Sequence, residues 1–119
     1  MNIDFIILAA GKGTRMGGDS PKVLACLAGK PMIQHLIDTV DSFQSSKTSI
    51  VVGYKSNEVE RDVVSQKKLR FVKQKNQLGT AHAVKQALPN IRKNSVAVIL
   101  YGDVPLVKKN TLNRLIKSA

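Results

Sequence analysis

The stretch "IDFIILAAGKGTRMGGDSPK", from Ile3 to Lys22, joins an apolar run to a loop rich in glycine and positive charge. The run from Ile3 to Ala10 is almost continuously apolar, which is typical of a strand buried on both faces of a parallel sheet. The loop contains four glycines and the cations Lys12, Arg15 and Lys22. Glycines let successive backbone N–H groups approach and point at one anion. The stretch therefore predicts a buried strand that ends in a phosphate-binding loop.

The glycine spacing in this loop matches neither of two well-known phosphate motifs. Gly11-Lys12-Gly13 lacks the four residues that separate the glycines of a P-loop, and Gly17 arrives one residue too late for a dinucleotide fingerprint. Phosphate chemistry is present all the same, because Arg15 can bind a phosphate through two N–H groups at once. The alternative is a flexible basic surface turn, and the apolar strand before the loop argues against it.

Strand and helix patterns alternate along the rest of the chain. Further strands are expected at 48–53, 69–72 and 96–100, and helices from Pro31, from Ser56 or Asn57, at 80–88 and at 110–117. Right-handed crossovers between parallel strands place helices on both faces of a sheet. The pattern predicts an α/β fold, Rossmann-like, with three α/β/α layers and a four-stranded, mostly parallel sheet.

The apolar positions of the first two helices indicate which residues face the sheet. The inward-facing residues are expected to be Met32, Leu36, Ile37 and Val40 in the first helix, and Val59, Val63 and Val64 in the second. Cys26 has no His or acidic partner in a motif, and we expect it to be a small packed residue.

Three of the loops that follow strands combine glycine with polar residues. The first strand is followed by the glycine loop, the third by "QKNQLGTAHA" and the fourth by "YGDVPL". In folds of this kind, ligands bind beyond the carboxyl ends of the strands, near the point where the strand order reverses. Asp103, in the last loop, is a lone carboxylate beside a phosphate-binding loop, where magnesium would sit.

The charge balance favours an anionic ligand. Lys and Arg number 19 against 8 acidic residues, which gives a formal net charge of +11. A nucleic-acid partner is less favoured than a local phosphate site, because aromatic residues that could stack on bases make up only 4% of the chain. The single cysteine fits a reducing compartment, and no apolar run is long enough to span a membrane, so the soluble cytoplasm is the expected location.

The motif L-A-A-G-K-G-T-R-M, followed by P-K, resembles the signature of sugar-phosphate nucleotidyltransferases with a MobA-like nucleotidyltransferase domain. "QKNQLGTAHA" and "LYGDVPL" make the resemblance more specific, because they are similar to the uridylyltransferase family that makes UDP-N-acetylglucosamine. The resemblance extends from the first strand to the last helix, and it implies the nucleotide-diphospho-sugar transferase fold. Lys75 and Asn76 depart from the acidic or neutral residues expected in the uracil loop.

The resemblance implies a role for each matching residue. The substrate-binding residues would be Leu8, Ala9, Ala10, Gly11, Lys12, Gly13, Thr14, Lys22, Gln74, Gly79, Thr80, Tyr101, Gly102 and Asp103. Of these, Gln74, Gly79 and Thr80 would read uracil and its ribose. The catalytic residues would be Arg15, Lys22 and Asp103, and Asp103 would also be a ligand of the catalytic Mg²⁺.

The reaction implied by the resemblance is an in-line displacement without a covalent enzyme intermediate. A phosphate oxygen of N-acetylglucosamine 1-phosphate would attack the α-phosphorus of UTP, and pyrophosphate would leave. The product, UDP-N-acetylglucosamine, is a precursor of peptidoglycan and lipopolysaccharide. Three alternatives stay open: a nucleotide-binding module without turnover, a related sugar-phosphate nucleotidyltransferase that uses another nucleotide or sugar, and a basic nucleic-acid binder.

The resemblance also implies a catalytic domain longer than these 119 residues. Residues 1–119 would form the nucleotide-binding half. The sugar-binding half, with the second magnesium ligand, would be absent, as would an acetyltransferase domain through which the family forms trimers. The fourth strand would then lie at an unpaired edge of the sheet, and a bare apolar edge invites self-association.

Overall fold

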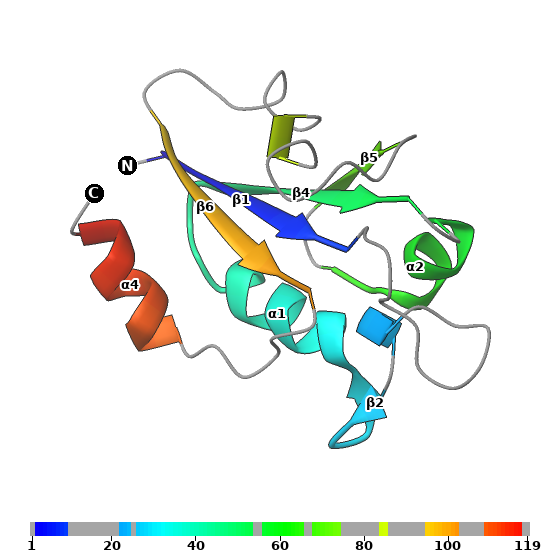
Figure 1. Cartoon of the computed structure of the whole chain (residues 1–119). Coiled ribbons are helices and arrows are strands. Elements are labelled where there is room, and N and C mark those ends of the chain that lie inside the picture. The colour runs from blue at the N-terminus through cyan, green and yellow to red at the C-terminus, as the bar shows by residue number, and fades with distance from the viewer. Residues whose placement is uncertain are drawn as a thin grey trace.

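The computed structural model describes residues 2–9, 22–24, 26–53, 56–65, 68–74, 84–85, 95–102 and 109–117. Its main sheet contains four parallel strands in the order β5-β4-β1-β6 (Figure 1). Their bounds are Asn2–Leu8 for β1, Ser46–Val52 for β4, Leu69–Lys73 for β5 and Ser95–Tyr101 for β6. The predicted α/β fold with a four-stranded parallel sheet is confirmed, and each strand differs from its expected range by one or two residues.

The path of the chain through this sheet reverses once. From β1 the chain goes to the neighbouring β4 and then outward to β5, before it returns to β6 on the other side of β1. The strand order therefore changes direction between β1 and β6. Crevices at such reversals, beyond the carboxyl ends of the strands, are where ligands bind in doubly wound folds.

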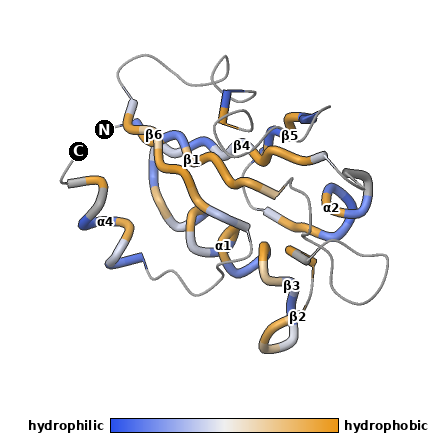
Figure 2. Tube along the Cα trace, in the orientation of Figure 1, coloured by the Kyte–Doolittle hydropathy of each residue, from blue (hydrophilic) through white to orange (hydrophobic). Residues whose placement is uncertain are grey.

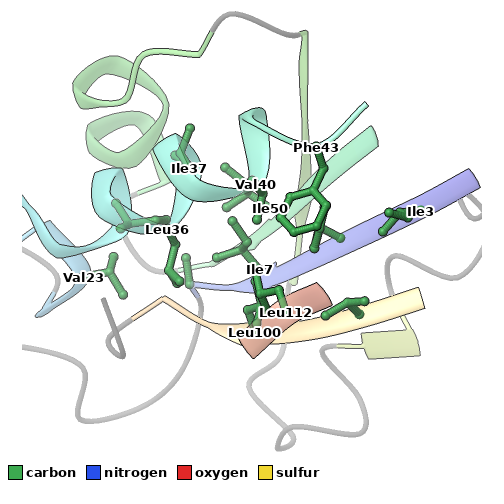
Figure 3. Packing of buried hydrophobic residues seen from close by; sticks show 14 of the residues in the cluster. Ile3, Ile7, Val23, Leu36, Ile37, Val40, Phe43, Ile50, Leu100 and Leu112 are labelled. Carbon is green, nitrogen blue, oxygen red and sulfur yellow. The ribbon is translucent and has the colours of Figure 1, made fainter. Parts of the chain in front are cut away.

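The larger part of the core lies on one face of the sheet. Three helices cover this face: α1 (Met32–Asp41), α2 (Ser56–Asp62) and α4 (Lys109–Lys117). Residues two apart in a strand point to the same face, so Phe5 and Ile7 of β1 face α1 together. Figure 3 shows Leu36 and Ile37 of α1 in the cluster above Ile7. Figure 2 shows the apolar character of β1 along most of its length.

The inner side of α1 differs from the prediction at one position. Leu36, Ile37 and Val40 are buried as expected, but the first inward residue is Ile33, which is fully buried, whereas Met32 is half-buried. The start of the helix differs too, because Pro31 is the N-cap with extended backbone rather than the first helical residue. In this position Pro31 also pairs with Cys26 in a short hairpin.

The opposite face of the sheet carries a second, smaller cluster. Ile6, Leu8 and Val51 are buried there, and Val84 packs against them. Val84 and Lys85 are helical and fall inside the helix expected at 80–88, whose other residues lie outside the described part of the chain. Because Val84 and α1 lie on opposite faces, the sheet is the middle layer of three (Figure 1).

A short hairpin that the sequence did not predict lies between β1 and α1. It consists of β2 (Cys26–Leu27) and β3 (Lys30–Pro31), and it follows η1 (Lys22–Leu24), which is one turn of 3₁₀ helix. Its two turn residues, Ala28 and Gly29, both have positive φ, at 52° and 87°. Two-residue hairpin turns favour such angles because their twist matches that of the strands. The hairpin leaves Cys26 exposed, so the expectation that it is packed was wrong.

Polar contacts fix this hairpin to α1. Lys30 donates to Asp38 at 2.6 Å, Gln34 donates to Asp38 at 2.8 Å, and Nε2 of His35 donates to the carbonyl oxygen of Leu27 at 2.6 Å. Partial burial acts to raise the pKa of the Asp38 carboxyl, but the hydrogen bonds from Lys30 and Gln34 outweigh it and lower that pKa. The chain segment that leaves η1 is thus held against a helix of the core.

Val64 was expected to face inward, and this expectation was wrong: its side chain is 74% exposed. The helix α2 ends at Asp62, so the helical spacing behind the expectation does not extend to Val64. The peptide of Val64 pairs instead with the carboxamide of Gln34, which donates to its carbonyl oxygen at 2.7 Å and accepts from its N–H at 2.8 Å. Val63, one residue earlier, packs against the core.

The buried hydroxyl of Thr48 allows a test of how the core is stabilised. It is 3% exposed, and its hydroxyl has no hydrogen-bond partner among the residues described. Thr48→Val is expected to raise the free energy of unfolding by about 1 kcal/mol, because it replaces an unpaired buried hydroxyl by a methyl group of similar size. Urea denaturation measures this difference. Thr48→Ser, the matched control, keeps the hydroxyl and loses a methyl group, and it should lower stability. A valine variant no more stable than the parent would contradict this account.

Candidate functional site

The predicted site residues that the structure describes lie at the carboxyl edge of the sheet. Leu8 and Ala9 end β1, Gln74 follows β5, and Tyr101 and Gly102 end β6. The backbone of Lys22 lies in η1. The remaining predicted residues lie outside the described part of the chain: Ala10, Gly11, Lys12, Gly13, Thr14, Arg15, Gly79, Thr80 and Asp103.

Backbone hydrogen bonds carry the sheet one residue beyond the end of each strand. The N–H of Ala9 donates to Val51 at 2.8 Å, that of Gln74 to Val52 at 2.7 Å, and that of Gly102 to Leu8 at 2.9 Å. Each bond fixes the residue from which a motif-bearing loop departs. The three loops therefore begin from rigid positions along one edge of the sheet.

Gly102 is at the most crowded of these positions. It is buried, and a Cβ atom added to it would lie 3.0 Å from Cγ1 of Val23 and 3.1 Å from the carbonyl oxygen of Leu8. Contacts this short are tighter than most real Cβ contacts, so a side chain here would force Val23 or the end of β1 to shift by a few tenths of an ångström. Val23 is 1% exposed, and this close approach places η1 directly against the ends of β1 and β6.

Gln74 and Tyr101 lie at opposite ends of the row of strands. Gln74 is 4% exposed, and its side chain ends in a carboxamide, a group with both donors and an acceptor. Tyr101 is 51% exposed. Because β5 and β6 are separated by three strand spacings, the two ends of the row are about 14 Å apart. An elongated ligand fits such a row better than a compact one.

A separate cleft of about 420 Å³ lies away from this edge, on the polar side of α1. It is lined by Gln34, Asp38, Asp41, Ser42, Val64 and Ser65, and none of these was a predicted site residue. Within it, Ser65 donates its hydroxyl proton to the carboxylate of Asp41, with oxygen–oxygen distances of 2.7 and 2.8 Å. The cleft is acidic, and the predicted ligand is an anion, so the cleft does not extend the predicted site.

A family comparison decides which of the known phosphate-binding folds this is. The model of the MobA-like NTP transferase domain matches residues 5–119. The chain belongs to the MobA-like NTP transferase family. Within that family, it is 49% identical over 119 residues to bifunctional protein GlmU of Nitrosomonas eutropha, and it spans 26% of that protein's length. It is 46% identical over 114 residues to bifunctional protein GlmU of Cellvibrio japonicus, of which it spans 25%.

Solved structures show the same fold. Rv0371c of Mycobacterium tuberculosis has a TM-score of 0.79 at 24% identity, and the match covers 98% of this chain and 59% of that one. Rv0371c has also been solved in complex with manganese. HddC of Yersinia pseudotuberculosis, complexed with GMP-PN, has a TM-score of 0.75 at 27% identity and covers 97% of this chain and 53% of that one.

Two features are absent from the described part of the chain: a helix that could span a membrane and a cluster of metal-binding side chains. Among the helices described, none has the length and apolar character needed to cross a membrane. The described residues also contain no group of three or more His, Cys, Asp or Glu side chains that could hold a metal ion. Magnesium does not need such a group, because it is bound through one or two carboxylates together with substrate phosphates and water. A single carboxylate after β6 fits this chemistry.

Val23 lies beside the predicted site, and the sequence did not point to it. It lies in an ordinary apolar pair, Val23-Leu24, between a predicted catalytic lysine and an unpredicted hairpin. No periodic pattern marks it, because a single 3₁₀ turn is too short to have one. Only the close approach to Gly102 reveals it.

Proposed function

We propose that this chain is the nucleotide-binding part of a uridylyltransferase that makes UDP-N-acetylglucosamine and pyrophosphate from UTP and N-acetylglucosamine 1-phosphate. The observation that carries the proposal is that three motif-bearing loops depart from the carboxyl ends of strands of one parallel sheet, whose strand order reverses between β1 and β6. The identity of 49% to bifunctional protein GlmU over the whole chain supports this choice within the family. Nucleotide substrates make the cytoplasm the proposed compartment.

In the proposed complex, the nucleotide lies across the row of strand ends. The base and ribose are bound near β5, by Gln74 with Gly79 and Thr80. The phosphates are bound near β1 and β6, where the glycine loop supplies backbone N–H groups and Lys12, Arg15 and Lys22 supply charge. The spacing of about 14 Å between β5 and β6 separates the two ends of the ligand in this way.

Asp103 is the residue proposed to hold Mg²⁺. Its carboxylate supplies the hard oxygen ligand that this ion prefers, and a second protein ligand from further residues, the substrate phosphates and water supply the rest. When bound, the ion neutralises charge on the phosphate oxygens and orients the attacking and leaving groups. One carboxylate after β6 fits a site that the substrate and those further residues complete.

The chain's own residues contribute position and charge rather than covalent chemistry. In-line attack requires the two reactants to be held in one geometry, which removes most of the entropic cost of bringing them together. Lys22 and Arg15 stabilise the negative charge that develops as the bond to pyrophosphate breaks. Backbone N–H groups of the glycine loop stabilise the same charge without having to reorganise.

We propose that residues 1–119 form the nucleotide half of the domain and that the sugar is bound by further residues. The chain spans about a quarter of the GlmU relatives and half to three-fifths of the matching structures, which supports this division. Two alternatives remain in the same class of protein: a nucleotide-binding module without turnover, and a transferase for another nucleotide. HddC, with its bound GMP-PN, is a reason to compare UTP with GTP, CTP and ATP.

The first prediction concerns the metal. Asp103→Asn is expected to remove the Mg²⁺ dependence of UTP binding, because an amide oxygen lacks the charge that attracts the ion. Calorimetric titration of UTP with and without Mg²⁺ measures it, and a urea midpoint shows that the fold is kept. Glu60→Gln, which neutralises an exposed carboxylate on α2, is the control and should behave as the parent does. Mg²⁺-dependent binding that persists in Asp103→Asn would refute the assignment.

The second prediction concerns the phosphates. Lys22→Ala and Arg15→Ala should each weaken UTP binding by about 1.5–3 kcal/mol, because each removes a charge-assisted hydrogen bond, and they should leave uridine binding nearly unchanged. Lys47→Ala is the matched control. Lys47 is exposed and lies near the start of β4, so it is at the amino ends of the strands, opposite to the predicted site. If UTP and uridine were weakened equally, the two cations would not bind the phosphates.

The third prediction concerns turnover. The chain of 119 residues is expected to bind UTP or UDP-N-acetylglucosamine weakly and to release very little pyrophosphate from UTP and N-acetylglucosamine 1-phosphate. A longer chain that includes the sugar-binding residues should be active, because both reactants must be held in line. A pyrophosphate-release assay compares the two. Equal rates would show that residues 1–119 hold the whole site and that the proposed division is wrong.

A further inference from the structure

Val23 lies directly against the space that a side chain at position 102 would enter. The contact is tight, since an added Cβ at Gly102 would meet Cγ1 of Val23 at 3.0 Å. Gly102 itself has little freedom, because its N–H is bonded to Leu8 at 2.9 Å and its Cα faces the carbonyl oxygen of Leu8 and the side chain of Ile7. Val23 is therefore seated on the rigid end of the sheet.

The same valine also belongs to the main core. It is 1% exposed and lies in the cluster that includes Leu36 of α1 and Leu100 of β6 (Figure 3). A single 3₁₀ turn such as η1 has too few hydrogen bonds to hold its own position. The packing of Val23, together with that of Leu24 against the same core, therefore positions η1 relative to the ends of β1 and β6.

Two residues of the proposed phosphate site are sequence neighbours of Val23 and Gly102. Lys22 directly precedes Val23, and Asp103 directly follows Gly102. We infer that the contact between Val23 and Gly102 is a positioning device, which sets the distance between the turn that carries Lys22 and the end of the strand that leads to Asp103. The inference rests on the proposed function, because it assigns the contact a role in holding the nucleotide's phosphates.

The chemistry explains why such a device is needed. A cation and a metal-binding carboxylate act on the same phosphates only when their separation matches the ligand, and an error of about 1 Å can cost about a hundredfold in rate. Lys22 and Asp103 are 81 positions apart in the sequence, so local structure cannot set their separation. In our inference, the buried contact between Val23 and Gly102, which are their sequence neighbours, sets this separation.

Val23→Ala tests this role, with Val40→Ala as the matched control. Both valines are fully buried in the same cluster, but Val40 lies near the end of α1, away from the site (Figure 3). The unfolding free energy and the Kd values for UTP and uridine with Mg²⁺ are measured for each variant. Both variants should be less stable. Only Val23→Ala should weaken UTP, by about tenfold or more, and uridine binding should stay within about twofold of the parent.

The double variant Val23→Ala with Gly102→Ala separates positioning from stability. Gly102→Ala alone should also weaken UTP, because the new methyl group pushes Val23 away from the strand end. In the double variant the methyl at position 102 fills part of the space that Val23 has vacated, so UTP affinity should recover by several-fold from that of Gly102→Ala. Additive losses in the double variant would overturn the inference.

Two further outcomes distinguish this inference from the function on which it rests. If Val23→Ala weakened UTP and uridine equally, or no more than Val40→Ala does, the contact would be an ordinary part of the core and the inference would be wrong while UTP binding stood. If the parent chain bound no UTP in the presence of Mg²⁺, the proposed function would fail first, and the positioning role would fail with it.

Discussion

The parallel pairing of β1 on both of its edges is the constraint on which the rest of the molecule depends. Its residues align with β4 from Ile3 to Leu8 and with β6 from Asn2 to Leu8. A strand enclosed in this way must be apolar on both faces, and Phe5, Ile6 and Ile7 are accordingly almost fully buried. Because β1 is shared, its end and the end of β6 are fixed to each other, so the two loops proposed to bind phosphate depart from positions that belong to the core.

What the sequence predicted well was determined by local pattern. The continuous apolar run of β1 and the alternation of strands and helices were enough to give the parallel sheet and to put Leu8, Gln74 and Tyr101 at the carboxyl ends of its strands. What it missed depends on contacts between distant residues. The hairpin turn uses Ala28 at positive φ, where no turn signal is present, and Val64 is turned outward because Gln34 pairs with its backbone from another element. The close approach of Val23 to Gly102 was also missed, because the two residues are far apart in the sequence.

The two edges of the sheet differ in how they resist pairing with another chain. The outer strand β5 carries Arg70 and Lys73, both exposed, and charges on an edge strand oppose the addition of a further strand. The strand β6 has no charged residue, its Ile99 is 45% exposed, and it pairs with β1 alone among the strands described. Exposed basic residues therefore protect the β5 edge, whereas β6 is the less protected edge among the strands described; self-association at the fourth strand stays a prediction.

The same strand order also divides the proposed work of the site. The outer position of β5 places Gln74 at the end of the row, whereas the loops proposed to bind the phosphates depart from the ends of β1 and β6, on either side of the reversal. A change in the loop after β5 can therefore alter base preference without moving the groups that bind phosphate. Such independence requires that the residues proposed to bind phosphate be positioned by the protein and not by the bound base. The fixed ends of β1 and β6, with Val23 packed against Gly102, can position them. A fold with this division can keep one set of phosphate contacts while the nucleotide that it selects changes.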